Sequence, residues 1–157
     1  MTLIERVMQH EGFRATPYID PLVAHNPEAH GITREQLETA REILAKLKLT
    51  FGYGFTYISK EEAEAVLEIR LKKIARDLDK KFSFFEKLPV TVQQALVEMA
   101  YQLGIGGVSK FKKMLAALEA EDWCEAYKEG KDSRWYRQTP KRAEAVLSAI
   151  KYYCKKN

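Results

Sequence analysis

The sequence predicts a mainly helical α+β fold with a small N-terminal lobe holding a short β-sheet, a long connecting helix and a helical C-terminal lobe. Apolar residues at helical spacing follow capping-box sequences that begin at Thr2, Thr33 and Ser59. Residues 49–56 (LTFGYGFT) instead combine strand-favouring aromatic and β-branched residues with glycines, which break helices. The periodic segment from about 60 to 80 is long enough to connect two lobes.

We expect the 157 residues to form a single domain. Its small lobe would cover about 13–59 and its interlobe helix about 60–80. The C-terminal lobe would cover about 81–157 and include the N-terminal helix, 2–11.

The small lobe is expected to begin with irregular chain, because the segment RATPYIDPLVAHNPEAHG contains three prolines and little periodicity. A short extended piece is predicted at residues 18–20. In the larger lobe, the most apolar helix would start at Thr91 and end at Gly104, and the last helix would start with Thr139 as cap and Pro140 in its first turn.

Composition sets limits on partners and cofactors. Lys and Arg number 26 against 22 Asp and Glu, and the sequence pI is near 9.0, which suits an anionic partner or a merely solvated basic surface. Cys124 and Cys154 do not form a spaced framework, so we expect free buried thiols and a reducing compartment. No apolar run approaches the ~18 residues of a membrane span. The charged start MTLIERVMQHEG is unlike a signal peptide, which favours synthesis in a cytoplasm without stable membrane insertion.

No cofactor or metal site is predicted. Residues 51–55 contain G-x-G without the third glycine of a dinucleotide loop. His25 and His30 lie on a proline-broken loop, where solvent-facing histidines are the simpler interpretation.

Two carboxylates remain as candidates for chemistry. Glu11 is the next member of the apolar face of the N-terminal helix, or else an exposed helix end, and Asp20 follows among polar loop residues. Paired carboxylates in unlike environments are what cleavage of a glycosidic bond requires, since one donates a proton and the other activates water. Spacing alone leaves unrelated surface acids as the default.

The segment HEGFRATPYID resembles the active-site opening of the phage lysozymes, glycoside hydrolase family 24. The segments ISKEEAEAVL, ALVEMAYQLGIGGVSKF and SRWYRQTPKRAEAV are similar to the interlobe helix, the central helix and the C-terminal signature of that family, in the same order. The resemblance implies a lysozyme fold and hydrolysis of the β-1,4 bond between N-acetylmuramic acid and N-acetylglucosamine in peptidoglycan, by inversion and without a cofactor.

The resemblance also implies roles for individual residues. Glu11 would be the general acid, Asp20 would activate or position water, and Thr50 in TFGYG would be a second water-positioning group. Arg142 would lie near Glu11 and help to tune it, or form a structural salt bridge. Trp135 would border the cleft or belong to the core, and the substrate-binding positions would be Thr56, Tyr101, Gln102 and Glu129.

The order of the small lobe departs from the family pattern, because residues 21–49 lie between Asp20 and the glycine run. Either Thr50 still reaches Asp20 through a longer crossover, which we favour, or the lobe has been rebuilt. Thr33 is the rival for the threonine role, but it serves better as a helix cap.

The resemblance, together with a start unlike a signal peptide, implies a monomeric endolysin that acts on peptidoglycan and waits in the host cytoplasm for a holin. A noncatalytic wall-binding protein on the same fold is the alternative. A basic nucleic-acid binder ranks last, because no recognition-helix pattern stands out.

Overall fold

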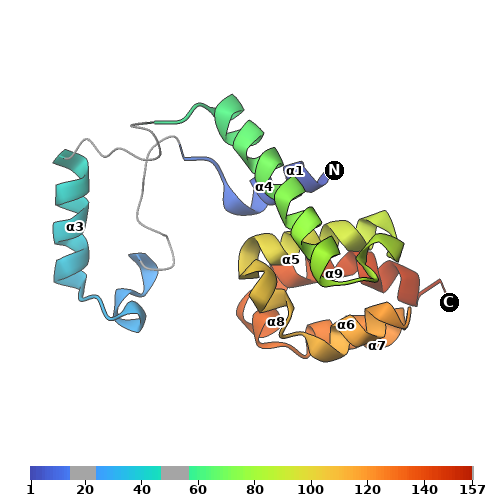
Figure 1. Ribbon diagram of the computed structural model, residues 1–157. Coiled ribbons are helices and arrows are strands. Elements are labelled where there is room, and N and C mark those ends of the chain that lie inside the picture. Colours follow the sequence, from blue (N-terminus) through green and yellow to red (C-terminus); the bar gives the residue numbers. More distant parts are fainter. Residues whose placement is uncertain (15–23, 47–56, 157) are drawn as a thin grey trace. The chain divides into compact units, whose positions relative to one another are not determined.

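The computed structural model describes residues 1–14, 24–46 and 57–156 of the chain (Figure 1). The chain divides into two compact units. The larger unit contains Met1–Glu11 and Val66–Asn157, and the smaller one contains Gly12–Ala65.

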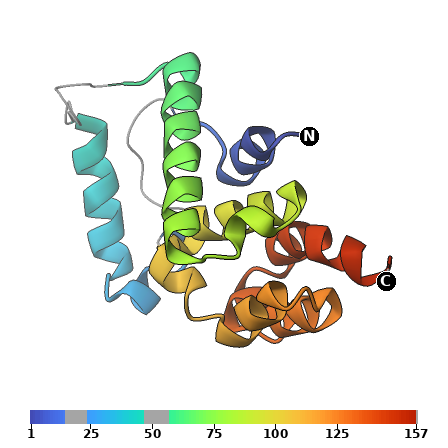
Figure 2. The same ribbon diagram turned by 45° about the vertical axis from the view of Figure 1, so that its right-hand side comes forward.

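The larger unit is a helical assembly around α5. Its helices are α1 (Leu3–Glu11), most of α4 (Lys60–Lys81), η2 (Phe85–Lys87), α5 (Val90–Val108), α6 (Lys112–Glu119), α7 (Trp123–Lys131), α8 (Arg134–Gln138) and α9 (Pro140–Cys154). Helix α7 packs against both α6 and α9, and α9 also contacts α5 and α8 (Figure 2). Fully buried side chains of α4, α5, α6 and α9 form the centre of the core: Leu78, Leu96, Met99, Leu118, Leu147 and Ile150.

The predicted break of the central helix at Gly104 is confirmed. The backbone leaves helical geometry at this residue, where φ is 71° and ψ is 162°, and a second helical segment follows, so that α5 as a whole runs to Val108. A residue with a side chain rarely adopts a positive φ, so glycine permits this local break. The helix then resumes for its final residues.

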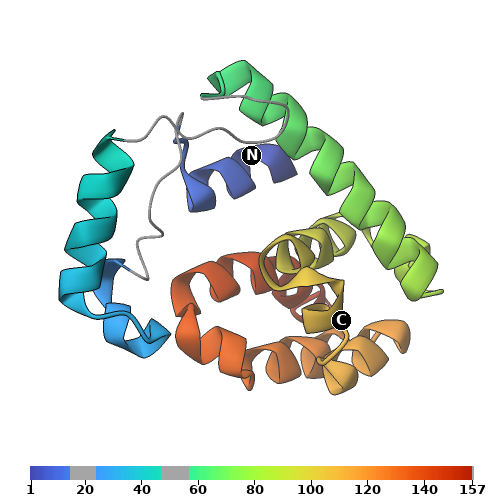
Figure 3. The same cartoon turned by 60° about the vertical axis from the view of Figure 1, so that its left-hand side comes forward.

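The smaller unit contains η1 (Pro27–His30) and α3 (Arg34–Lys46), which pack together (Figure 3). The expected short β-sheet is wrong, because the chain over 1–14, 24–46 and 57–156 forms helices and no strand. Strand propensity is decided by packing and pairing rather than by residue type alone, so a run of strand-favouring residues does not by itself make a sheet. The runs that suggested it, 18–20 and 49–56, lie outside the described residues.

The three predicted capping boxes are confirmed. The backbone amide of Glu5 donates to Oγ1 of Thr2 at 3.2 Å, while the amide of Thr2 donates to the Glu5 carboxylate at 2.7 Å. The same reciprocal bonds join Thr33 with Gln36 before α3 and Ser59 with Glu62 before α4. Each box satisfies amides that a helix start leaves unpaired, which is why these helices begin where the local sequence indicates.

The prediction of free thiols is wrong, because Cys124 and Cys154 form a disulfide with Cα atoms 4.6 Å apart. Helices α7 and α9 pack side by side, and this packing brings together residues that are 30 positions apart in the sequence. The cysteines therefore give no argument for a reducing compartment. Among the described helices, none combines the length and apolarity that crossing a membrane requires.

Candidate active site

Glu11 is the last residue of α1, and its side chain is 42% exposed. Its Oε1 accepts a hydrogen bond from Nη2 of Arg142 at 2.7 Å. Arg142 lies in the first turns of α9, 131 residues later in the chain. The structure therefore brings together the two charged residues that the family resemblance pairs, and it places Glu11 at an exposed helix end.

Helix geometry explains why Glu11 needs this partner. The C-terminal end of a helix carries partial negative charge, so a carboxylate there is disfavoured unless a cation offsets it. The Arg142 guanidinium provides that cation, and its side chain is only 17% exposed. Nε of Arg142 is buried and has no hydrogen-bond partner among the described residues, so the pair with Glu11 is the bond that orients the guanidinium.

Trp135 and Gln102 are also brought together. The indole Nε1 of Trp135 donates to Oε1 of Gln102 at 2.8 Å, and the Trp135 ring meets Phe111 edge to face with centroids 6.0 Å apart. Trp135 is 5% exposed, which confirms it as core. Tyr101, the residue before Gln102 on α5, is half-buried.

An open pocket of about 860 Å³ lies beside Trp135. It is lined by residues from the end of α5 through α8, including Glu129, whose Oε1 lies 3.7 Å from Nζ of Lys113. Lys110 and Lys112 also line it. Glu129, which is predicted to bind substrate, and Trp135 therefore line the same pocket, together with several lysines.

Comparison with known proteins supports the resemblance in sequence. The model of the family described as "Phage lysozyme" matches residues 8–149. The chain belongs to the phage lysozyme family.

This phage lysozyme family member matches part of the length of three curated relatives. The chain is 34% identical over 161 residues to the pre-baseplate central spike protein Gp5 of Enterobacteria phage T4, covering 96% of this chain and 28% of that protein. It is 32% and 37% identical to the probable T4-type lysozymes 1 and 2 of Dictyostelium discoideum, covering 59% of this chain and 56% of each of those proteins. The chain therefore spans about a quarter of the spike protein and just over half of the two lysozymes.

Three other predicted site residues are not among the residues that the structure describes. Asp20, Thr50 and Thr56 lie outside the described residues. Thr33, the rival for the threonine role, uses its Oγ1 to cap α3 by accepting from the Gln36 amide at 3.1 Å, which confirms its expected role as a cap. Within the described ranges, no group of His, Cys, Asp and Glu residues is arranged to hold a metal ion.

Sequence reasoning missed two carboxylates with several partners each. Glu98 on α5 is 1% exposed and contacts Arg6 and His10 of α1. A signal was present, because a charge within the apolar run ALVEMAYQL requires a buried partner.

The second is Glu144 on α9. Its carboxylate accepts hydrogen bonds from Lys151, Tyr127 and Tyr136 at 2.8, 2.8 and 3.0 Å. The bond from Lys151, followed by that from Tyr127, lowers the pKa of Glu144 to about 2. This network joins α7, α8 and α9, and so supports the helices that carry Trp135 and Arg142.

Proposed function

We propose that the chain hydrolyses the β-1,4 bond between N-acetylmuramic acid and N-acetylglucosamine in bacterial peptidoglycan. The observation that carries this proposal is the 2.7 Å pair between Glu11 and Arg142, two residues that both lie within the matched range 8–149. Membership of the phage lysozyme family supports glycoside hydrolase activity.

Glu11 is the general acid in this proposal. Its exposed side chain is accessible to a polymeric substrate, and only Oε1 is engaged by Arg142 among the described residues. Oε2 can therefore hold the proton that passes to the leaving glycosidic oxygen. When that proton leaves, Arg142 stabilises the carboxylate that forms, because an adjacent cation favours the charged state.

Asp20 is the proposed partner that activates or positions the attacking water, with Thr50 as a second water-positioning group. Inversion at the anomeric carbon requires a water molecule between substrate and base, so the two carboxyl groups should be ~6.5–9.5 Å apart. Proton NMR of the first product formed distinguishes the routes, since inversion gives the α-anomer and retention gives the β-anomer.

The proposed substrate contacts are Thr56, Tyr101, Gln102 and Glu129. The pocket beside Trp135 is suited to the carboxylates of peptidoglycan stem peptides, because its four basic lining residues, Lys110, Lys112, Lys113 and Arg134, outnumber its two acidic ones, Glu129 and Asp132. We further propose that the protein acts as a monomer, without nucleic acid, and reaches the wall from the host cytoplasm through a holin lesion.

The test is clearing of a peptidoglycan suspension together with release of new reducing ends. We expect the wild-type protein to clear the suspension, and Glu11→Gln to lose about 10²–10⁴-fold in rate while remaining folded. Glu38→Gln is the matched control, because Glu38 is an exposed carboxylate paired with Arg41 on α3.

Three results separate the alternatives. Wall binding without clearing by the wild-type protein would support a noncatalytic wall-binding protein. Steeply salt-dependent DNA affinity without wall cleavage would support a nucleic-acid binder. Equal loss of activity in Glu38→Gln and Glu11→Gln would remove the assignment of Glu11 as the acid.

A further inference from the structure

Glu98 is a charged residue in the most buried helix of the larger unit. Among the described residues it is the one buried charged side chain, at 1% exposure, and its neighbours Val97 and Met99 are buried core residues. A carboxylate in such a site is costly unless both of its oxygens are hydrogen bonded.

Both carboxylate oxygens of Glu98 are bonded to α1. Nε of Arg6 donates to Oε2 at 3.2 Å, and Nδ1 of His10 lies 2.8 Å from Oε1. An ionised carboxylate can only accept, so the Nδ1 atom of His10 carries the proton in this contact. Nη2 of Arg6 also reaches Oε1 of Gln94 at 3.5 Å, one turn before Glu98 on α5.

Arg6 and His10 are placed to fix the orientation of α1. Arg6 and His10 are four positions apart, so they lie on the same side of α1, one turn above the other. Two contacts with one carboxylate fix both the rotation of α1 about its helix axis and the position of α1 along that axis. Helix α1 has nine residues, too few to be stable alone, so its orientation depends on such tertiary contacts.

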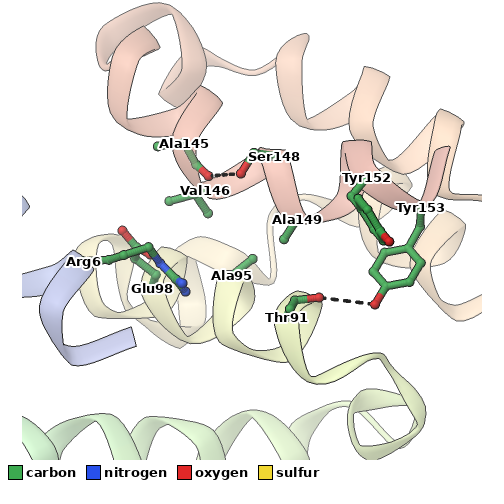
Figure 4. Close-up of a pocket in the computed structure, with 10 residues that line it drawn as sticks. All are labelled: Arg6, Thr91, Ala95, Glu98, Ala145, Val146, Ser148, Ala149, Tyr152 and Tyr153. Atoms are coloured by element: carbon green, nitrogen blue, oxygen red, sulfur yellow. Dashed lines mark hydrogen bonds and ion pairs between the residues drawn. The ribbon is translucent and has the colours of Figure 1, made fainter. Parts of the chain in front are cut away.

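The side of α1 that carries Arg6 borders a pocket. A pocket of about 330 Å³ lies between α5 and α9, and Arg6 and Glu98 line one end of it (Figure 4). The other end is closed by a contact of 3.4 Å between the hydroxyl groups of Thr91 and Tyr153. Val7, which is fully buried, and the partly buried Leu3 and Ile4 pack against the core, and the ionic contacts with Glu98 hold α1 on the side that borders the pocket.

We propose that Glu98 is a positioning residue for Glu11, acting through Arg6 and His10. His10 directly precedes Glu11, so the rotation that sets His10 against Glu98 also directs Glu11 toward Arg142. This inference rests on the proposed function, since it assigns Glu98 a role in placing the general acid. A shift of about 1 Å in a reacting group can cost on the order of 10²-fold in rate, which makes such an anchor kinetically important.

The first experiment compares Glu98→Gln with the wild-type protein by wall-cleavage kinetics and by hydrogen exchange of the α1 amides. We expect kcat to fall by about 10- to 100-fold and KM to change by less than about twofold. The α1 amides should exchange faster, because the neutral amide places a donor group against Arg6 or His10.

Asp77→Asn is the matched control, because it neutralises a carboxylate of α4 in the same unit whose partner is Lys73 rather than an α1 residue. This variant should keep the wild-type kcat and the wild-type exchange of the α1 amides. An equal fall in kcat in both variants would reduce Glu98 to a general stabilising role and overturn the inference.

His10 provides a second pair of variants in case Glu98→Gln does not fold. The side-chain amide of His10→Asn can place a donor near the position of Nδ1, whereas His10→Ala removes it. We expect His10→Asn to retain most of the kcat and His10→Ala to lose it; equal kcat in the two overturns the inference. If the wild-type protein does not cleave walls, the proposed function fails, whereas an active wild type with a fully active Glu98→Gln refutes the positioning role alone.

Discussion

Reduction of the disulfide between Cys124 and Cys154 should destabilise the protein substantially. The bond closes a loop across 30 positions, from the start of α7 to the end of α9. Loop-closure entropy for that length gives about 3.6 kcal/mol of stabilisation at room temperature. For a domain of this size, each kcal/mol shifts Tm by roughly 2–4 °C, so the expected decrease is about 7–14 °C.

The assay is thermal unfolding followed by circular dichroism, with and without a phosphine reductant. Cys124 is exposed, so the reductant can reach the bond in the folded protein. The double variant Cys124→Ser/Cys154→Ser is the control, because its Tm should match that of the reduced wild-type protein and should not respond to reductant. If the oxidised and reduced wild-type proteins melt within about 2 °C of each other, the loop-closure reasoning is refuted.

Two further predictions concern stability of the larger unit. The pKa of Glu144 in the folded protein is about 2, below the ordinary value of 4.5, so the stability that this carboxylate contributes is present above about pH 4.5 and is lost as pH falls through about 2. The Glu144 side chain is 36% exposed and therefore partly screened by solvent, so its contribution to the free energy of unfolding should be about 1–2 kcal/mol. In urea unfolding, the difference in stability between the wild-type protein and Glu144→Gln should shrink from pH 6 to pH 2. Gly130→Ala should cost about 1–3 kcal/mol by urea unfolding, because its Cβ would lie 2.7 Å from Cδ2 of the fully buried Leu147. Gly106→Ala, whose Cβ meets nothing within 4 Å, should be neutral or stabilising, and an equal loss in both glycine variants would contradict the packing argument.

Local features of the fold could be predicted because their causes lie within a few residues. The capping boxes at Thr2, Thr33 and Ser59 each depend on side chains three positions apart, so the sequence contains all the information needed. The break in helical geometry at Gly104 can be predicted for a related reason. Glycine indicates where a helix can break, but only the packing of the following residues decides whether it resumes.

Features that depend on helix packing could not be predicted in the same way. The bond between Cys124 and Cys154 exists because α7 lies against α9, and nothing in the spacing of two isolated cysteines shows that contact. The charge of Glu98 within an apolar helix indicates that a basic side chain contacts it, but not which of the Lys, Arg and His residues does so. Glu11 and Arg142 were paired correctly through the family resemblance, since 131 residues separate them.

The residues of the proposed reaction come from both units of the chain. Glu11 is the last residue of the larger unit before the chain enters the smaller one at Gly12. Its partner Arg142 and the anchor formed by Glu98 belong to the larger unit as well. Among the described residues, the side chains that orient the acid in this proposal therefore all belong to the larger unit. The proposed water-positioning carboxylate, Asp20, belongs to the smaller unit, so mutations there should alter activation of water while leaving the pair between Glu11 and Arg142 intact.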